Sequence, residues 1–330
     1  MNAKTAAKKP AEKAALPAFN FRRLPGGRVL LTNDSGANAV VTAAAFRSLS
    51  AGRVPAGALR AELEAKGFVR DRMDFESYAA AGAARSSFLN SGPGLHILVT
   101  TLRCNHRCLY CQASACGGRG TDMSRAVARK SVDFALNSTN PGLTIEFQGG
   151  EPLLNWPVLS DAISYARRRA RAAGREARLA LVSNFSLMTE QKARFLLENE
   201  VSLCTSLDGP AALHNKNRQF TGGNAHALTV RWLKYFADRA SGKQGDYRVF
   251  KPSALLTVTR FSLENPAAIV DEYVRLGLED VFIRPLTPIG YARKLWPQIG
   301  YTAAEFSAFY RDCLGRILKV NASGKTLRER

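Results

Sequence analysis

From Leu95 onward the chain alternates six apolar runs with six amphipathic stretches. Strands that alternate with helices form a parallel sheet with the helices outside it, and right-handed crossovers curl such a sheet into a partial barrel. We therefore expect an α/β fold with a partial (β/α)6 barrel. The expected strands are 95–101, 143–148, 179–184, 202–207, 253–259 and 280–286, and the expected helices are 124–138, 156–173, 189–198, 225–239, 266–276 and 303–320.

The predicted helix ends carry suitable capping residues. Gly174 and Gly277 follow two helix ends, and Asn265-Pro266 is a cap with proline at the first helical position. Thr302-x-x-Glu305 has the spacing of a capping box.

Three cysteines follow the first predicted strand at a metal-binding spacing. Cys104, Cys108 and Cys111 form a C-x3-C-x2-C run, and thiolates so spaced bind zinc or iron and sulfur. Zinc would need His106 or Cys116 as a fourth ligand, and no second C-x2-C pair follows downstream. A two-cysteine redox motif leaves Cys104 unexplained. An iron-sulfur cluster with one iron not bound by protein uses all three cysteines.

A second motif ends the second predicted strand. Gly149-Gly150-Glu151-Pro152 follows the run 143–148, where two glycines let the backbone approach a ligand closely and proline fixes the exit. Ligands of parallel sheets lie at the carboxyl ends of strands. Both motifs therefore belong to the same end of the predicted barrel.

The pair of motifs resembles those of the radical S-adenosylmethionine (SAM) superfamily. The resemblance implies a [4Fe-4S] cluster on Cys104, Cys108 and Cys111 and S-adenosyl-L-methionine on the open iron. It further implies that Tyr110 contacts adenine and that Gly149, Gly150, Glu151 and Pro152 hold the methionyl amine. The implied chemistry is electron transfer from the cluster, cleavage of the sulfonium C–S bond and hydrogen abstraction by a 5'-deoxyadenosyl radical.

The other strand ends are expected to face the same cavity. The third strand of relatives often ends in Thr-Asn-Gly, and Asn184 of Ser183-Asn184-Phe185 stands at the matching position as a cofactor contact. Ser206 and Asp208 either bond a ribose or carboxylate or make a turn, while Thr257, Thr259 and Arg284 end later strands.

The segment 214–218 resembles one in peptide-modifying members, where Arg218 pairs with a carboxylate; its charge favours the alternative of a solvated loop. Of the other cysteines, Cys204 and Cys313 are expected in the core and Cys116 is expected to be a bystander.

Residues 18–92 form a separate small α+β module in this interpretation, after a disordered tail at 1–17 that holds four lysines. Strands at 19–24, 28–33 and 39–41, a helix from Thr42 to Ser50 and a helix at 56–66 suggest a winged-helix-like unit. It resembles the recognition elements that capture the leader of a ribosomally made peptide as an added strand. The alternatives are a DNA-binding winged helix and a mere packing unit.

The whole layout most resembles the His-Xaa-Ser system radical SAM maturases, in the SPASM-type branch. Such maturases continue into a Cys-rich domain with auxiliary clusters, whereas this chain ends at Arg330 with one cysteine after the sixth strand. We expect a 93–330 barrel without that auxiliary domain, either as a truncation or as an enzyme that works without it. The expected substrate is a precursor peptide.

Charge and hydropathy set the remaining expectations. The net charge is +20, from 47 basic and 27 acidic residues, which favours acidic partners. Arginines at 167–178 make either a solvated helix face or a docking site for a reductant such as flavodoxin. Stacking aromatics do not interleave with the arginines, so nucleic acid is a disfavoured partner. No apolar run is long enough to cross a bilayer and no signal peptide is evident, so we expect a cytoplasmic protein with no membrane partner.

The leading functional prediction is radical modification of a peptide. The alternatives are a radical SAM enzyme that acts on RNA and a non-catalytic iron-sulfur scaffold.

Overall fold

The computed structural model describes residues 16–113, 122–241 and 248–330. The chain divides into two compact units, Met1–Gly92 and Pro93–Arg330. Most of the predicted disordered tail, and Cys116, lie outside the described residues.

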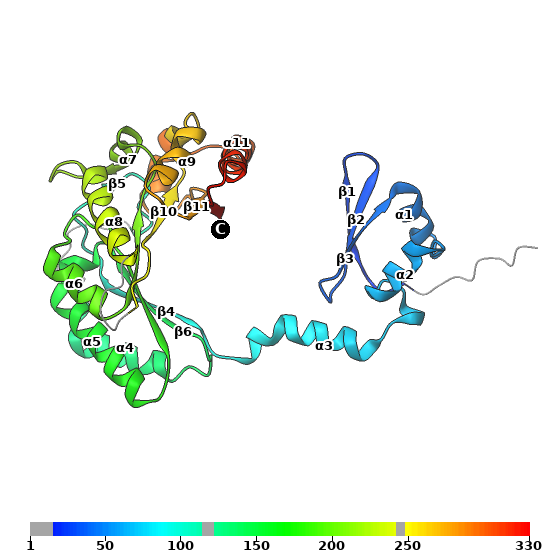
Figure 1. The fold of residues 1–330 in the computed structure, drawn as a ribbon, viewed down its shortest axis with the longest axis horizontal. Helices are drawn as coiled ribbons and strands as arrows, with labels where there is room; N and C mark the ends of the chain where they lie inside the picture. The colour runs from blue at the N-terminus through cyan, green and yellow to red at the C-terminus, as the bar shows by residue number, and fades with distance from the viewer. Residues whose placement is uncertain (1–15, 114–121, 242–247) are drawn as a thin grey trace, which may run out of the picture. The chain divides into compact units, whose positions relative to one another are not determined.

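The first unit is a three-stranded antiparallel sheet followed by short helices, shown in Figure 1. The strands are β1 (Asn20–Leu24), β2 (Arg28–Thr32) and β3 (Asn38–Thr42), and the helical segments are α1 (Ala43–Ser50), α2 (Ala58–Ala65), η1 (Arg70–Arg72), α3 (Phe75–Ser86) and η2 (Ser87–Asn90). Among the described residues β1 and β3 each pair with β2 alone, so both are sheet edges.

Alternation along the strands builds the core of this unit. Val29 and Leu31 of β2 and Val41 of β3 point to one face and are buried with Leu49 of α1 and Leu63 of α2. The Thr42 side chain accepts from the Ala45 backbone amide and begins α1, as predicted.

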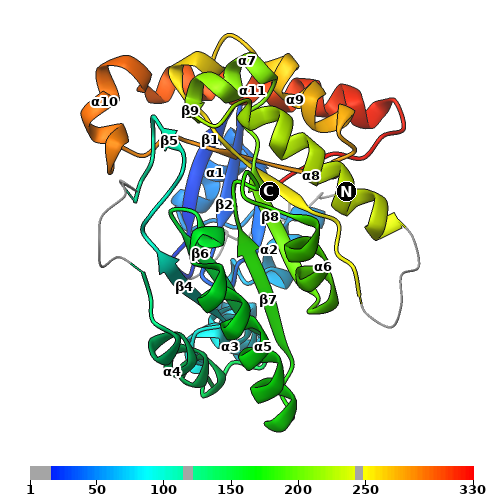
Figure 2. The ribbon, with the colours of Figure 1, turned by 90° about the vertical axis from the view of Figure 1, so that its left-hand side faces the viewer.

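The second unit is a seven-stranded parallel sheet in the order β12-β11-β10-β8-β7-β6-β4, with helices outside it (Figures 1 and 2). All of its strand pairs are parallel. The strands are β4 (Leu95–Thr101), β6 (Leu143–Gly149), β7 (Ala177–Val182), β8 (Val201–Ser206), β10 (Ser253–Thr257), β11 (Asp280–Arg284) and β12 (Arg328–Glu329). The helices that follow the first six of these strands include α4 (Arg125–Leu136), α5 (Trp156–Ala172), α6 (Glu190–Glu198), α8 (Ala225–Ser241), α9 (Pro266–Arg275) and α11 (Ala303–Ala322).

Every predicted strand and helix of this unit is present, and the predicted α/β fold class is confirmed. The capping predictions also hold: Gly174 and Gly277 adopt φ of 61° and 69° after α5 and α9, and Thr302 and Glu305 form both bonds of a capping box. Pro266 occupies the first turn of α9, but the Asn265 side chain makes no cap bond.

Several short elements were not predicted. They are the strands β5 (Arg107–Cys108) and β9 (Arg218–Gln219), the helices α7 (Ala211–Asn217) and α10 (Tyr291–Ile299), and the 3-10 segments η3 (Pro152–Asn155) and η4 (Arg260–Ser262). Strand β12, which extends the sheet beyond β11, was also not predicted and has two residues, like β5 and β9.

The two faces of the parallel sheet differ. Leu143, Ile145 and Phe147 of β6 are buried against the helices, while Glu146 and Gln148 face inward and are half-buried. The core therefore lies between sheet and helices, and the curled inner face stays open for a ligand. None of the described helices combines the length and the apolar character that a bilayer crossing requires.

Candidate active site

A cavity of about 240 Å3 lies at the carboxyl ends of the strands of the second unit. We name residues 102–113, which follow β4, the Cys loop. The loop and five strand ends contribute to the lining, including Cys104, His106, Cys108, Tyr110, Cys111, Gly149, Gly150, Asn184, Ser206, Arg218, Thr257 and Arg284. Most of the predicted site residues thus line one cavity, while Glu151, Pro152 and Asp208 are buried and are not among the lining residues.

The Gly-Gly-Glu-Pro turn holds the Cys loop by its backbone. The Gly150 amide donates to the Thr101 carbonyl and the Glu151 amide donates to the Arg103 carbonyl, both at 2.8 Å. A Cβ atom on Gly149 would collide with the Thr101 carbonyl oxygen, and one on Gly150 with that of Arg103. The two glycines are therefore needed for this close approach, besides exposing backbone to the cavity.

Glu151 joins the turn to the end of β7. Its buried carboxylate accepts from the Leu153 amide, the Asn184 amide and the Ser183 hydroxyl at 2.8 to 2.9 Å. Burial raises the pKa of Glu151, against the opposing effect of these three hydrogen bonds. Because every bond is to protein, this carboxylate orients the two strand ends.

The end of β7 also orients the Cys loop. The Asn184 amide group donates to the Asn105 side chain at 3.0 Å, and Asn105 donates to Ser186 at 2.7 Å. Phe185, at the position where the resemblance leads us to expect glycine, adopts a left-handed φ of 61° and is fully buried. The chain thus keeps the backbone turn that a glycine favours and fills the space beneath it with an aromatic ring.

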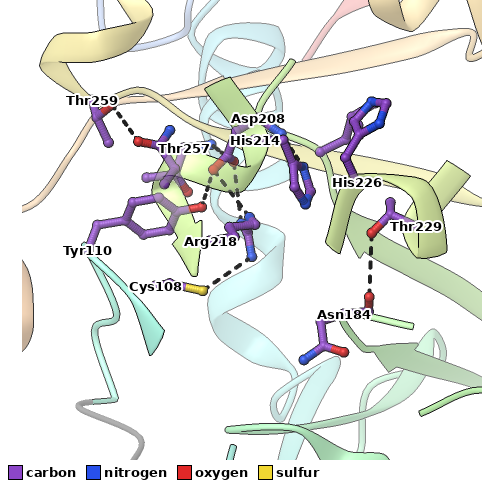
Figure 3. Close-up of polar contacts among 12 residues, drawn as sticks. Cys108, Tyr110, Asn184, Asp208, His214, Arg218, His226, Thr229, Thr257 and Thr259 are labelled. Atoms are coloured by element: carbon purple, nitrogen blue, oxygen red, sulfur yellow. Dashed lines mark hydrogen bonds and ion pairs between the residues drawn. The ribbon is translucent and has the colours of Figure 1, made fainter. Parts of the chain in front are cut away.

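Strand β5 of the Cys loop pairs with β9, with Cys108 opposite Arg218. Arg218 forms a buried ion pair with Asp208 at 3.2 Å, and the Tyr110 hydroxyl donates to the same carboxylate at 2.5 Å (Figure 3). Arg218 is only 8% exposed, so the alternative of a solvated loop at 214–218 is wrong for this residue. The sequence did not show the reason, which is the pairing of β9 with β5.

His106 lies between the cysteines and is almost fully buried. Its ring stacks on Phe220 with 4.6 Å between centroids, and neither ring nitrogen has a hydrogen-bond partner among the described residues. Burial, with a contribution from the Arg218 charge, lowers the pKa of His106 to about 4. The imidazole is therefore neutral at physiological pH.

The surroundings of the three thiols bear on their role as cluster ligands. Burial raises the pKa of Cys104 to about 11 and that of Cys108 to about 12, so metal binding must displace their protons. In the described ranges no three His, Cys, Asp or Glu side chains are arranged to hold one metal ion. The thiols instead surround a shared cavity, which fits a cluster that gives each cysteine its own iron.

Two features of the site were missed or misjudged. Cys204 is half-buried on the inner face of β8 with Ser202 and Ser206, so its predicted place in the core is wrong, whereas Cys313 is in the core as predicted. Gly290, at the start of α10, was not singled out. Its Cβ would collide with the Cys111 carbonyl, and the next amide, of Tyr291, donates to that carbonyl at 3.0 Å. The sequence signal for it is Pro-Ile-Gly directly before α10.

Comparisons with known proteins agree with this geometry. Residues 98–241 match the Radical SAM superfamily. The cysteine-type anaerobic sulfatase-maturating enzyme of Clostridium perfringens is 29% identical over 134 residues, which cover 38% of this chain and 36% of that enzyme. The chain thus spans little more than a third of the length of this relative.

Two solved structures share the fold. The native enzyme anSMEcpe with bound AdoMet superposes with a TM-score of 0.59 at 21% identity, covering 72% of this chain and 63% of that one. Streptococcus suis SuiB bound to the precursor peptide SuiA superposes with a TM-score of 0.56 at 12% identity, covering 94% of this chain and 71% of that one.

The cofactors of the superfamily are a [4Fe-4S] cluster and S-adenosylmethionine, and the described cavity has the thiols and the bare backbone that suit them. On the family match, the chain contains a radical SAM domain at residues 98–241.

Proposed function

We propose that this protein is a radical SAM maturase that modifies a ribosomally made peptide. The observation that carries the proposal is the meeting of the three thiols of the Cys loop with Gly149 and Gly150 in one cavity. When bound, the reduced cluster supplies the electron that cleaves S-adenosylmethionine and so produces a 5'-deoxyadenosyl radical.

The protein's own groups position the cofactors in this proposal. Cys104, Cys108 and Cys111 each hold one iron, and Gly149 and Gly150 present their backbone to the methionyl group. Further lining groups are the Tyr110 ring, the Ser206 hydroxyl and the Asn184 amide. Glu151 and Asp208 act one layer deeper, because their carboxylates are fully buried and bonded to protein groups.

The peptide substrate is supported by the first unit and by the structural relatives. SuiB, which is bound to its precursor peptide in the solved structure, matches 94% of this chain, a span that includes much of the first unit. The first unit has two sheet edges, β1 and β3, and an edge can accept an extended peptide through main-chain hydrogen bonds. We assign the leader of the precursor peptide to one of these edges.

The proposal also needs a reductant and a compartment. A low-potential donor such as flavodoxin would deliver the electron, and its acidic surface would suit a chain with net charge +20. Reduced thiols and an oxygen-labile cluster suit the cytoplasm.

The test is anaerobic co-expression of the full-length gene with a small peptide encoded beside it. We expect mass spectrometry to find a mass change in the peptide that depends on Cys104, Cys108 and Cys111. Purified protein with dithionite should convert S-adenosylmethionine to methionine and 5'-deoxyadenosine. Cofactor cleavage without any peptide modification would reject the peptide assignment and leave the radical chemistry; no cleavage at all would favour a scaffold role.

A further inference from the structure

One contact joins a buried arginine to a cysteine of the Cys loop. Arg218 Nη1 lies 3.9 Å from the Cys108 sulfur. The contact is fixed by backbone pairing, because Cys108 and Arg218 face each other in the β5–β9 ladder and the adjacent Leu109 amide donates to the Asn217 carbonyl at 3.0 Å. The arginine therefore has little freedom to leave the sulfur.

Asp208 orients the guanidinium toward this sulfur. Arg218 Nε and Nη2 donate to the two Asp208 oxygens at 3.2 and 3.4 Å, which leaves Nη1 for Cys108. The Asp208 carboxylate is itself fixed by the Tyr110 hydroxyl at 2.5 Å and the Thr257 amide at 3.3 Å. Figure 3 shows this chain of contacts running from Thr257 through Asp208 and Arg218 to Cys108.

The surroundings make the contact electrostatically strong. Asp208 is fully buried and Arg218 is 8% exposed, and the guanidinium lies 5.2 Å from the centre of the Tyr110 ring. Hydrogen bonds and charges act more strongly where water is excluded. A donor on a cluster thiolate stabilises the reduced cluster, which carries one more negative charge, and so raises the reduction potential.

We propose that Arg218, oriented by Asp208, raises the reduction potential of the cluster by donating to the Cys108 thiolate. Arg218 thus acts on the reduction potential of the cluster through Cys108, and it does so whether or not substrate is bound. The inference rests on the proposed function, which makes Cys108 a cluster ligand.

The primary test is a redox titration of the cluster by electron paramagnetic resonance, in the full chain and without S-adenosylmethionine. In Arg218→Gln we expect the ratio of reduced to oxidised cluster at a fixed potential to fall at least tenfold, which corresponds to about 59 mV for one electron. Arg107→Gln is the matched control, because Arg107 precedes Cys108 and is exposed. It removes the same formal charge, and we expect less than a twofold change.

A second variant separates the effect of the Arg218 N–H contact from the effect of net charge, and it is less prone to misfold. Removing one partner of a buried ion pair leaves an uncompensated charge, whereas removing both is better tolerated. In Asp208→Asn/Arg218→Gln the net charge is unchanged, and we expect the tenfold deficit to persist. The inference would be overturned if the double variant, with full iron content, had a ratio of reduced to oxidised cluster within twofold of that of the unsubstituted protein.

The titration separates this inference from the proposed function. An Arg218→Gln protein with full iron content and an unchanged ratio rejects the tuning role, while the cluster assignment stands. If the unsubstituted protein takes up no cluster, the proposed function itself fails and the inference fails with it.

Discussion

Gly290 contacts the end of the Cys loop, whereas the Gly-Gly-Glu-Pro turn contacts its beginning. It has a φ of 59°, and a Cβ there would collide with the carbonyl oxygens of Cys111 and Gln112. Gly174 has nearly the same φ, 61°, but nothing lies within 4 Å of its Cβ position. Substitutions at Gly174 and Gly290 therefore distinguish the cost of a left-handed backbone, which both share, from collision with the Cys loop, which only Gly290 has.

We expect Gly174→Ala to cost about 1–2 kcal/mol of unfolding free energy, the penalty of a left-handed alanine. Gly290→Ala should cost more and should also lower the iron bound per chain, because the Cys111 backbone must move. Urea denaturation and iron analysis of the two variants check this. Equal stability and equal iron content in both would show that the loop does not depend on this contact.

Phe185 tests whether the left-handed backbone after β7 is strained. Its side chain is fully buried and its ring lies 5.7 Å from that of Phe236, so Phe185→Ala should cost about 3–5 kcal/mol. Phe185→Gly loses the same ring but relieves the φ of 61°, so it should be about 1 kcal/mol more stable than the alanine variant. Chemical denaturation of both variants measures their unfolding free energies. A Phe185→Ala protein as stable as Phe185→Gly, or more stable, would contradict the prediction.

At the scale of elements, α8 and α9 are joined by an ion-pair cluster around Glu272. His226 Nε2 lies 2.8 Å from the Glu272 carboxylate, and Arg275 donates to it at 2.6 and 2.8 Å. Burial raises the pKa of Glu272, but the hydrogen bonds from Arg275 and His226 outweigh it and hold the pKa below its usual range. Since the folded-state pKa is lowered, the carboxylate stabilises the fold above its unfolded pKa, and this contribution is lost as the pH falls through the folded value.

We therefore expect Glu272→Gln to lower the unfolding free energy by about 1–3 kcal/mol near neutral pH. The difference from the unsubstituted protein should be full above the usual pKa of a glutamate and should close as the pH falls through the lowered pKa of the folded carboxyl. Urea titrations at several pH values measure it. A difference that stays constant down to acid pH would rule out the charged form of Glu272 as its origin.

We expect the arginines of α5 and the turn after it to be a poor docking face for a reductant. Arg167 donates to the Asn199 and Glu200 carbonyls, and Arg175 donates to carbonyls after α4, so both tie elements together. They stand at the start of β7, whereas the cavity is at its end. Strand β7 alone spans about 20 Å at the usual rise per residue.

We accordingly expect Arg171→Glu, on the exposed face of α5, to change the rate of cluster reduction by flavodoxin less than twofold. Arg175→Glu should instead lower thermal stability, because it removes bonds to backbone carbonyls. Stopped-flow reduction and thermal unfolding measure these effects. A tenfold slower, salt-dependent reduction in Arg171→Glu would place the donor on α5 after all.

The sequence predicted the long elements well and the short ones poorly. Runs such as 143–148 and 303–320 show clear periodicity, and the structure has β6 and α11 there. Strands β5 and β9 have two residues each, too few for any period. They exist because the fold brings Cys108 and Arg218 together, so the solvated-loop alternative for 214–218 is wrong for Arg218, although Lys216 is exposed.

For the molecule as a whole, the position of the candidate site followed from topology. Parallel strands bring their carboxyl ends to one rim, so Cys104, Gly149, Ser206 and Arg284 meet there although they are far apart in sequence. What the sequence did not reveal is the layer beneath. The buried bonds of Glu151 and Asp208 depend on which side chains face each other across strands, and this is decided only when the core packs.

The central claim is that Cys104, Cys108 and Cys111 hold a cluster to which S-adenosylmethionine binds. Anaerobic reconstitution followed by iron and sulfide analysis and electron paramagnetic resonance tests it most directly. We predict about four iron and four sulfide per chain, a spectrum that changes on addition of S-adenosylmethionine, and loss of the signal in Cys104→Ala, Cys108→Ala and Cys111→Ala. Zinc in place of iron and sulfide, or an unchanged cluster in the three variants, would contradict the claim.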